Sequence, residues 1–157
     1  MLVIRIVLLI LILATLVFIF YNSTLSGEKS GEASESVGNI IATIIPPDTT
    51  VGECIQDYIM KIAHFTEYGL LGIECALYIS IFKRRRIKWA LASPLFALVT
   101  GFIDESIQIA SKRGPAIIDV WIDIGGFIFF SLIAYAVIFA VWQTVKLVRQ
   151  GKTRTDG

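Results

Sequence analysis

The amino-acid sequence predicts an all-α membrane protein, a four-helix transmembrane bundle with both termini cytoplasmic. Hydrophobic residues make up 55% of the 157 residues, charged residues only 17%, and the mean hydropathy is +0.74. Soluble domains carry about a quarter charged residues, so this composition favours an integral membrane protein. The formal net charge of +1 gives no reason to expect a nucleic-acid partner. The lipid bilayer is therefore the first partner that we expect.

The first transmembrane helix is predicted within residues 1–21. Val3 to Tyr21 consists almost entirely of Ile, Leu, Val and Phe, and it is long enough to cross about 30 Å of hydrocarbon. A cleaved signal peptide is the alternative. The apolar run is longer than the usual signal core, however, and the small residues Thr24-Leu25-Ser26 make a poor cleavage site. We therefore expect a retained N-terminal anchor.

Residues 22–51 are predicted to form an extracytoplasmic acidic loop. Asn22 to Ser36 is rich in Ser, Gly and Glu and shows no hydrophobic period, which is typical of a flexible segment. Val37 to Ile45 is apolar but too short to span, and Pro46-Pro47 ends any helix there. This short segment is expected to lie at the membrane interface.

Residues 52–148 are predicted to form a three-helix core, followed by a frayed cytoplasmic tail at 149–157. The expected helices are Gly52 to Phe82, Trp89 to Ser111 and Asp119 to Val148, each long enough to cross a bilayer. Five small residues within these helices are expected to mark close helix contacts rather than hinges. They are Gly69, Gly72, Ala76, Gly125 and Gly126.

Basic residues predict the orientation of the bundle. Ten of the 14 lysines and arginines fall on one side of it: Arg5, the five in residues 83–88, and the four in residues 146–154. This side is cytoplasmic by the positive-inside rule. The first loop, in contrast, carries six acids between Glu28 and Asp57 against the single Lys29, which suits the outer side.

Polar residues of the last three helices are predicted to meet at one depth near the outer surface. Measured from the cytoplasmic helix ends at 1.5 Å per residue, five of them lie about 22 to 28 Å along their helices. They are His64, Glu67, Glu105, Gln108 and Asp123. Ionisable residues at membrane depth are costly, so they indicate a functional site. The candidate catalytic or binding residues are His64, Glu67, Asp104, Glu105, Gln108, Arg113, Asp119 and Asp123.

Several interpretations of these residues remain open. The carboxylates could form a scaffold around Arg113, which can bind a carboxylate or a phosphate in a bidentate manner. The acids outnumber the nearby cations, however, and surplus carboxylate needs a proton, a metal or a ligand. His64 and Glu67, three apart on a helix, could begin a divalent metal site, although one histidine among acids also suits acid–base chemistry. The sequence therefore identifies no cofactor.

Two stretches of the chain resemble the VanZ-like membrane proteins, a family named for a teicoplanin-resistance protein of Gram-positive bacteria. Residues 64–68, His-Phe-Thr-Glu-Tyr, are similar to the H-F-x-E-Y stretch of the family. Residues 104–126 resemble its D-E-x-x-Q…R…D-V-x-x-D/N-x-x-G block. The resemblance covers about residues 58 to 130 and leaves the first helix and the acidic loop outside. Ile107 stands where many relatives have a second histidine, which argues against a two-histidine mechanism.

The resemblance implies a multi-pass protein of the bacterial plasma membrane, linked in some members to lower susceptibility to teicoplanin-type antibiotics. It does not imply a reaction. The expected partner is a lipid-linked or peptide-bearing cell-wall component, or the lipoglycopeptide itself. The alternative function is a small proton- or cation-coupled transporter, because intramembrane acids and a histidine can form a proton relay. Glu74 is the only acid predicted below the outer layer, so this alternative ranks lower.

Overall fold

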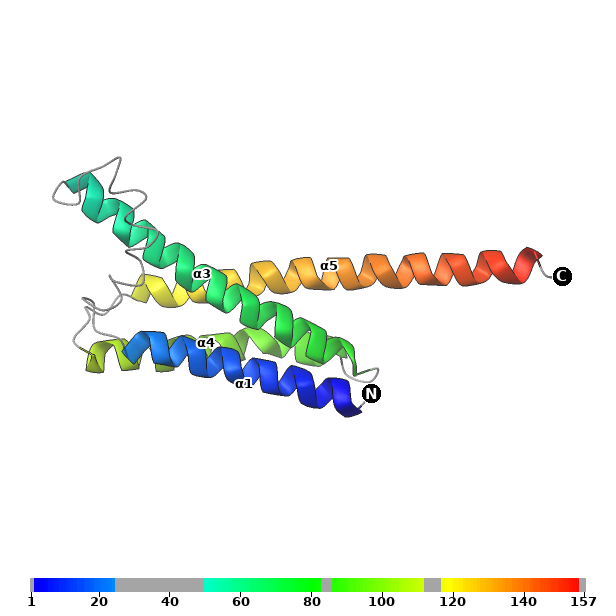
Figure 1. Cartoon of the computed structure of the whole chain (residues 1–157), viewed down its shortest axis with the longest axis horizontal. Coiled ribbons are helices and arrows are strands. Elements are labelled where there is room, and N and C mark those ends of the chain that lie inside the picture. Colours follow the sequence, from blue (N-terminus) through cyan, green and yellow to red (C-terminus); the bar gives the residue numbers. More distant parts are fainter. Residues whose placement is uncertain (1, 25–49, 83–85, 112–116, 156–157) are drawn as a thin grey trace.

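The computed structural model describes residues 2–24, 50–82, 86–111 and 117–155. In this part of the chain all regular structure is helical (Figure 1). The helices are α1 (Leu2–Thr24), α3 (Thr50–Ser80), α4 (Arg86–Ala110) and α5 (Ile117–Thr155). The predicted all-α architecture is confirmed.

The four described helices run alternately in opposite directions along one long axis (Figure 1). α1 and α4 lie side by side, and α3 crosses them and packs most extensively on α5. The guanidinium carbon of Arg5 lies 4.6 Å from the ring centre of Phe82, so α1 begins beside the end of α3. The start of α1 and the end of α5 lie on the same side of the molecule.

Three of the described helices, α1, α4 and α5, are long and apolar enough to cross a membrane. Helix α3 does not meet this standard, because His64, Glu67 and Glu74 lower its hydropathy. The side chains of all three residues contact other helices of the bundle rather than facing outward. The chain therefore has three described helices able to cross a membrane, and a fourth crossing by α3 remains a prediction.

The helix ends differ from the predicted ones by one to three residues, and by more at the end of α5. Asn22 and Ser23 belong to α1, although we expected a flexible loop from Asn22 onward. They remain helical because their side chains bind acids of α3 and α4. At the other end α5 continues to Thr155, beyond the predicted limit at Val148, since the Lys, Arg and Gln residues there favour a helix. The expected interfacial segment, residues 37–45, lies outside the described residues.

The core of the bundle is small and joins all four described helices. Its buried hydrophobic residues are Ile12, Ile19, Tyr68, Leu71, Cys75, Ala97 and Phe127. Most large apolar side chains on α1, α4 and α5 point outward, as expected of helices whose surroundings are lipid. Packing inside the bundle therefore depends on a narrow stripe of each helix.

Glycines allow α3 and α5 to approach closely. A Cβ atom on Gly72 would meet the backbone carbonyl of Phe127, and one on Gly126 would meet the backbone of Phe65. A Cβ on Gly69 would run into the ring of Phe130. The predicted role of these three glycines is confirmed. Gly125 differs, because a Cβ there would meet only the Phe65 ring at 3.9 Å, an ordinary contact.

The orientation of the bundle can be tested with cysteines placed at Ser30, Gly114 and Arg85, in a background lacking Cys54. These three positions lie outside the described residues. We expect a membrane-impermeant thiol reagent to label the first two in intact cells and to leave the third unlabelled, because the basic segment should face the cytoplasm. Lysed cells, in which all three should react, provide the control. Labelling at Arg85 in intact cells would show that the protein is inverted.

Candidate functional site

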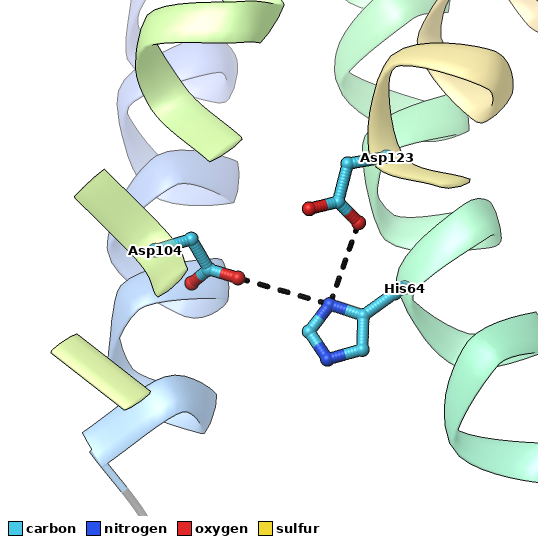
Figure 2. A group of neighbouring side chains, drawn as sticks. All are labelled: His64, Asp104 and Asp123. Atoms are coloured by element: carbon cyan, nitrogen blue, oxygen red, sulfur yellow. Dashed lines mark ion pairs between the residues drawn. The ribbon is translucent and has the colours of Figure 1, made fainter. Parts of the chain in front are cut away.

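Three side chains from three different helices converge at the end of the bundle where α4 ends and α5 begins. His64 comes from α3, Asp104 from α4 and Asp123 from α5 (Figure 2). The Nδ1 atom of His64 lies 3.8 Å from Oδ2 of Asp104 and 3.6 Å from Oδ1 of Asp123. One potential ligand atom of each residue lies within 4.8 Å of the others. We call these three residues the His–Asp cluster.

The Asp104 carboxylate is fully buried and fixed by neighbouring donors. Asp104 is 0% exposed, and its Oδ1 atom accepts a hydrogen bond from the Ser23 hydroxyl of α1. Its Oδ2 accepts a hydrogen bond from Nε2 of Gln108, one turn later on α4, at 3.0 Å. Two donors from different helices therefore hold this carboxylate in one orientation.

The Asp123 carboxylate has a different environment. The residue is only 2% exposed, and its Oδ1 has no hydrogen-bond partner among the described residues. Nδ1 of His64 likewise lacks a hydrogen-bond partner within the described part of the chain. These two atoms face each other at a distance too long for a hydrogen bond. The cluster thus contains buried polar atoms whose hydrogen-bonding capacity is unused.

Close packing of α3 on α5 explains why His64 and Asp123 meet. Gly126 lies next to the backbone of Phe65, directly after His64 in the sequence. Asp123 lies three residues before Gly126, so both are on the same face of α5. Phe65 also packs between the rings of Phe129 and Phe130, at centroid distances of 6.0 and 5.8 Å. This contact fixes the height of the histidine relative to the aspartate.

Helix α1 supplies three polar groups that the sequence analysis missed. Asn22 donates a hydrogen bond to Glu67 at 2.9 Å, and the Ser23 hydroxyl binds Asp104. Farther along the bundle, the Thr15 hydroxyl donates to Glu74 at 3.0 Å. The signal was present in the sequence, because Thr15, Asn22 and Ser23 are the helix's last three polar positions before Thr24 and share one face.

The remaining predicted site residues are arranged around the cluster with different degrees of contact. Glu105 is buried beside Asp104 on α4, at 8% exposure. Asp119 is half-buried one turn before Asp123, and its Oδ1 has no hydrogen-bond partner among the residues described. Glu67 accepts a hydrogen bond from Asn22 of α1. Arg113 lies outside the described residues, so its predicted pairing with these acids stays a prediction.

The arrangement is chemically versatile. An imidazole between two carboxylates can accept and donate protons, and the same three groups can ligate a divalent metal ion. Burying these groups among apolar helices is costly, so their presence indicates a functional site. The fold and the site together define a membrane protein with a buried histidine–aspartate cluster near one end of its bundle.

Comparison with models of protein families shows to which family this membrane protein belongs. A family model described as VanZ/LLP1 matches residues 6–141, which is most of the chain, and the chain therefore belongs to this family. The match includes most of α1 and the whole predicted acidic loop at residues 22–51, so our expectation that both lie outside the resemblance was wrong. Hydrogen bonds join α1 to Glu67, Glu74 and Asp104, so this helix is part of the same bundle as the other matched helices. Neither the curated proteins nor the solved structures contain a match to this chain.

Proposed function

We propose that this VanZ-like protein acts in the plasma membrane of Gram-positive bacteria and lowers susceptibility to teicoplanin-type glycopeptides. In this proposal the His–Asp cluster opens toward the outer surface. There it binds or processes a lipid-linked or peptide-bearing cell-wall component, or the lipophilic antibiotic itself. The observation that carries the proposal is the convergence of His64, Asp104 and Asp123 from three helices in a buried position.

The burial of this cluster favours a working site over a simple scaffold. Asp104 and Asp123 are almost completely buried within the bundle, and both stand close to one imidazole. A helix pair can be held by a neutral hydrogen bond, as Ser131 of α5 and the Gly72 carbonyl of α3 demonstrate. Two aspartates brought this close repel each other unless a proton or a cation is shared between them. This is the arrangement expected of a group that reacts or binds.

The proposal assigns different tasks to the polar residues. His64 exchanges a proton with the bound component, while Asp123 supports the charged imidazole. Asp104, held by Ser23 and Gln108, orients the histidine from the α4 side. Arg113, placed by the sequence in the loop between α4 and α5, would hold an anionic head group through its guanidinium. Glu67 and Glu105 complete the polar lining.

The proposal predicts loss of protection in cells when the cluster is changed. The protein and its His64→Gln, Glu105→Gln and Arg113→Ala variants would be expressed in a teicoplanin-susceptible Gram-positive host. We expect the unchanged protein to raise the inhibitory concentration several-fold and His64→Gln to return it to the level of the empty vector. Arg113→Ala and Glu105→Gln should weaken protection, since head-group binding and the polar lining would be impaired.

A matched control is Ser106→Ala, on the exposed side of the same helix as Asp104. Its hydroxyl binds only the Phe102 carbonyl of its own helix among the described residues, so protection should be retained. Membrane levels of every variant would be measured by immunoblotting. Full protection by all three site variants at equal protein levels would refute the proposed function.

A further inference from the structure

We propose that His64, Asp104 and Asp123 bind one divalent transition-metal ion, for which Zn²⁺ is the best fit. This inference goes beyond the proposed function, because it assigns a cofactor to the cluster whatever component the site recognises. A bound ion occupies Nδ1 of His64, so it replaces the proton exchange assigned to that residue above. It rests on three features of the described residues: the spacing of the ligand atoms, the unused hydrogen-bonding capacity of His64 and Asp123, and the groups that hold the ligands.

The spacing of the three side chains suits a single ion. With metal–ligand bonds of about 2.0 to 2.2 Å, two ligands of a tetrahedral ion stand about 3.3 to 3.6 Å apart. Nδ1 of His64 lies 3.6 Å from Asp123 and 3.8 Å from Asp104, which is close to this range. The separations are too long for hydrogen bonds and short enough for one shared ion. Figure 2 shows Nδ1 directed between the two carboxylates.

Two buried atoms of the cluster have no hydrogen-bond partner among the residues that the structure describes. Oδ1 of Asp123 and Nδ1 of His64 accept or donate no hydrogen bond within the described chain, although both atoms are inaccessible to solvent. Asp123 as a whole is 2% exposed, and its carboxylate points at the imidazole. Buried polar atoms without partners are rare in proteins and usually indicate an ion, a water or a catalytic role. A cation between these atoms would satisfy both.

Groups around the cluster hold the proposed ligands in place. Ser23 and Gln108 donate hydrogen bonds to Asp104, which is how the ligands of metal sites are commonly oriented. Gly126 brings the α3 backbone beside α5 and so sets the position of His64. The ligands therefore come from three helices, and α1 braces one of them. Such support is what a preformed metal site requires.

The ligand types indicate which metal would bind. One imidazole with two carboxylates suits Zn²⁺ or a neighbouring ion such as Mn²⁺ or Fe²⁺, whereas Mg²⁺ and Ca²⁺ prefer oxygen ligands alone. Affinity generally rises toward the end of the first transition series, which favours Zn²⁺ among the redox-inactive ions. Three protein ligands leave a coordination position open, as in catalytic zinc sites. A carbonyl or phosphoryl oxygen of a bound component could take that position, where the ion would polarise it.

The competing interpretation is a charged imidazole held between two carboxylates without any metal. Both interpretations need His64 near Asp104 and Asp123, so geometry alone does not separate them. They differ in metal content and in the response of the protein to added metal. The test must therefore measure metal directly, without relying on antibiotic susceptibility.

The experiment uses the full-length protein purified in detergent without chelators, with metal measured by inductively coupled plasma mass spectrometry. We expect close to one equivalent of Zn²⁺ in the unchanged protein and less than about a tenth of that in His64→Gln and Asp123→Asn. Glu74→Gln is the matched control, because it removes another buried carboxylate whose partner is Thr15. This control should retain the metal.

A second measurement keeps the proposal testable if a variant is poorly folded. After treatment with EDTA, the unchanged protein should gain several degrees in melting temperature when Zn²⁺ is added, since the ion binds only the folded state. Asp123→Asn should show no such gain while eluting as a monodisperse species. Absence of bound metal together with no response to Zn²⁺ would overturn the metal site. Neither result depends on the cell assay, so the proposed function can fail independently.

Discussion

Replacing Gly126 by alanine should separate α3 from α5 and destabilise the protein by about 3 kcal/mol, the upper end of the usual cost of overpacking. The added Cβ would run into the Phe65 carbonyl group, with the carbonyl carbon at 2.9 Å and the Cα at 3.0 Å. The obstacle is backbone, so no side-chain rotation relieves it. Thermal unfolding of the detergent-solubilised protein would measure the loss.

The neighbouring Gly125→Ala change provides a close control. Its Cβ would meet only the Phe65 ring at 3.9 Å, and alanine favours a helix over glycine by about 1 kcal/mol. We therefore expect its stability to equal or exceed that of the unchanged protein. Equal melting temperatures for the Gly126→Ala and Gly125→Ala variants would contradict the close backbone contact, and with it the means by which His64 is positioned.

Neutralising Asp104 should cost about 2 kcal/mol of stability, whereas neutralising Asp123 should cost nothing or stabilise the protein. The Asp104→Asn change replaces an oxygen by a donor beside the Ser23 hydroxyl and the Gln108 amide, both of which donate to the carboxylate. Hydrogen bonds to a charged acceptor are roughly twice as strong as neutral ones. Oδ1 of Asp123 accepts no hydrogen bond from the described residues, and its charge repels that of Asp104.

The stabilities must be compared in EDTA, because the Asp123→Asn change would destabilise the protein if Asp123 held a cation. Denaturation of the two variants and of the unchanged protein would be followed by circular dichroism in the same detergent. Equal losses for Asp104→Asn and Asp123→Asn would indicate that both acids serve a scaffold in the same way. A loss confined to Asp123→Asn would reverse our account of which carboxylate is held by its neighbours.

The sequence was sufficient to predict that polar residues from different helices would meet. Helical rise alone placed His64 and Asp123 at the same height, and the structure brings them to 3.6 Å. Spacing could not predict which acid would be hydrogen-bonded, because that depends on the rotation of each helix about its own axis. Asp104 and Glu105 are neighbours in sequence and both are buried, yet only Asp104 adjoins His64 in the cluster.

The contribution of α1 was harder to see from the sequence. Its composition is so apolar that it resembles a simple anchor, and Asn22-Ser23 looks like the start of a polar loop. The structure extends the helix through these residues because acids of α3 and α4 lie opposite them. Amphipathic period is the usual sequence signal for a buried face, and it is weak where lipid replaces water on the other face. Isolated hydroxyl and amide groups are then the better signal.

The location of the acids near helix ends bears on how the chain can enter a bilayer during synthesis. Asp104 lies six residues before the end of α4 and Asp123 six residues after the start of α5, each about 9 Å from the helix terminus. Each helix can therefore insert with its aspartate still near the wet interface. Glu74 of α3 is the deeper acid. Its donor Thr15, like Asn22, the donor to Glu67, belongs to the helix synthesised before α3. The order of the chain thus puts the hydrogen-bond donors in the membrane ahead of the carboxylates that need them.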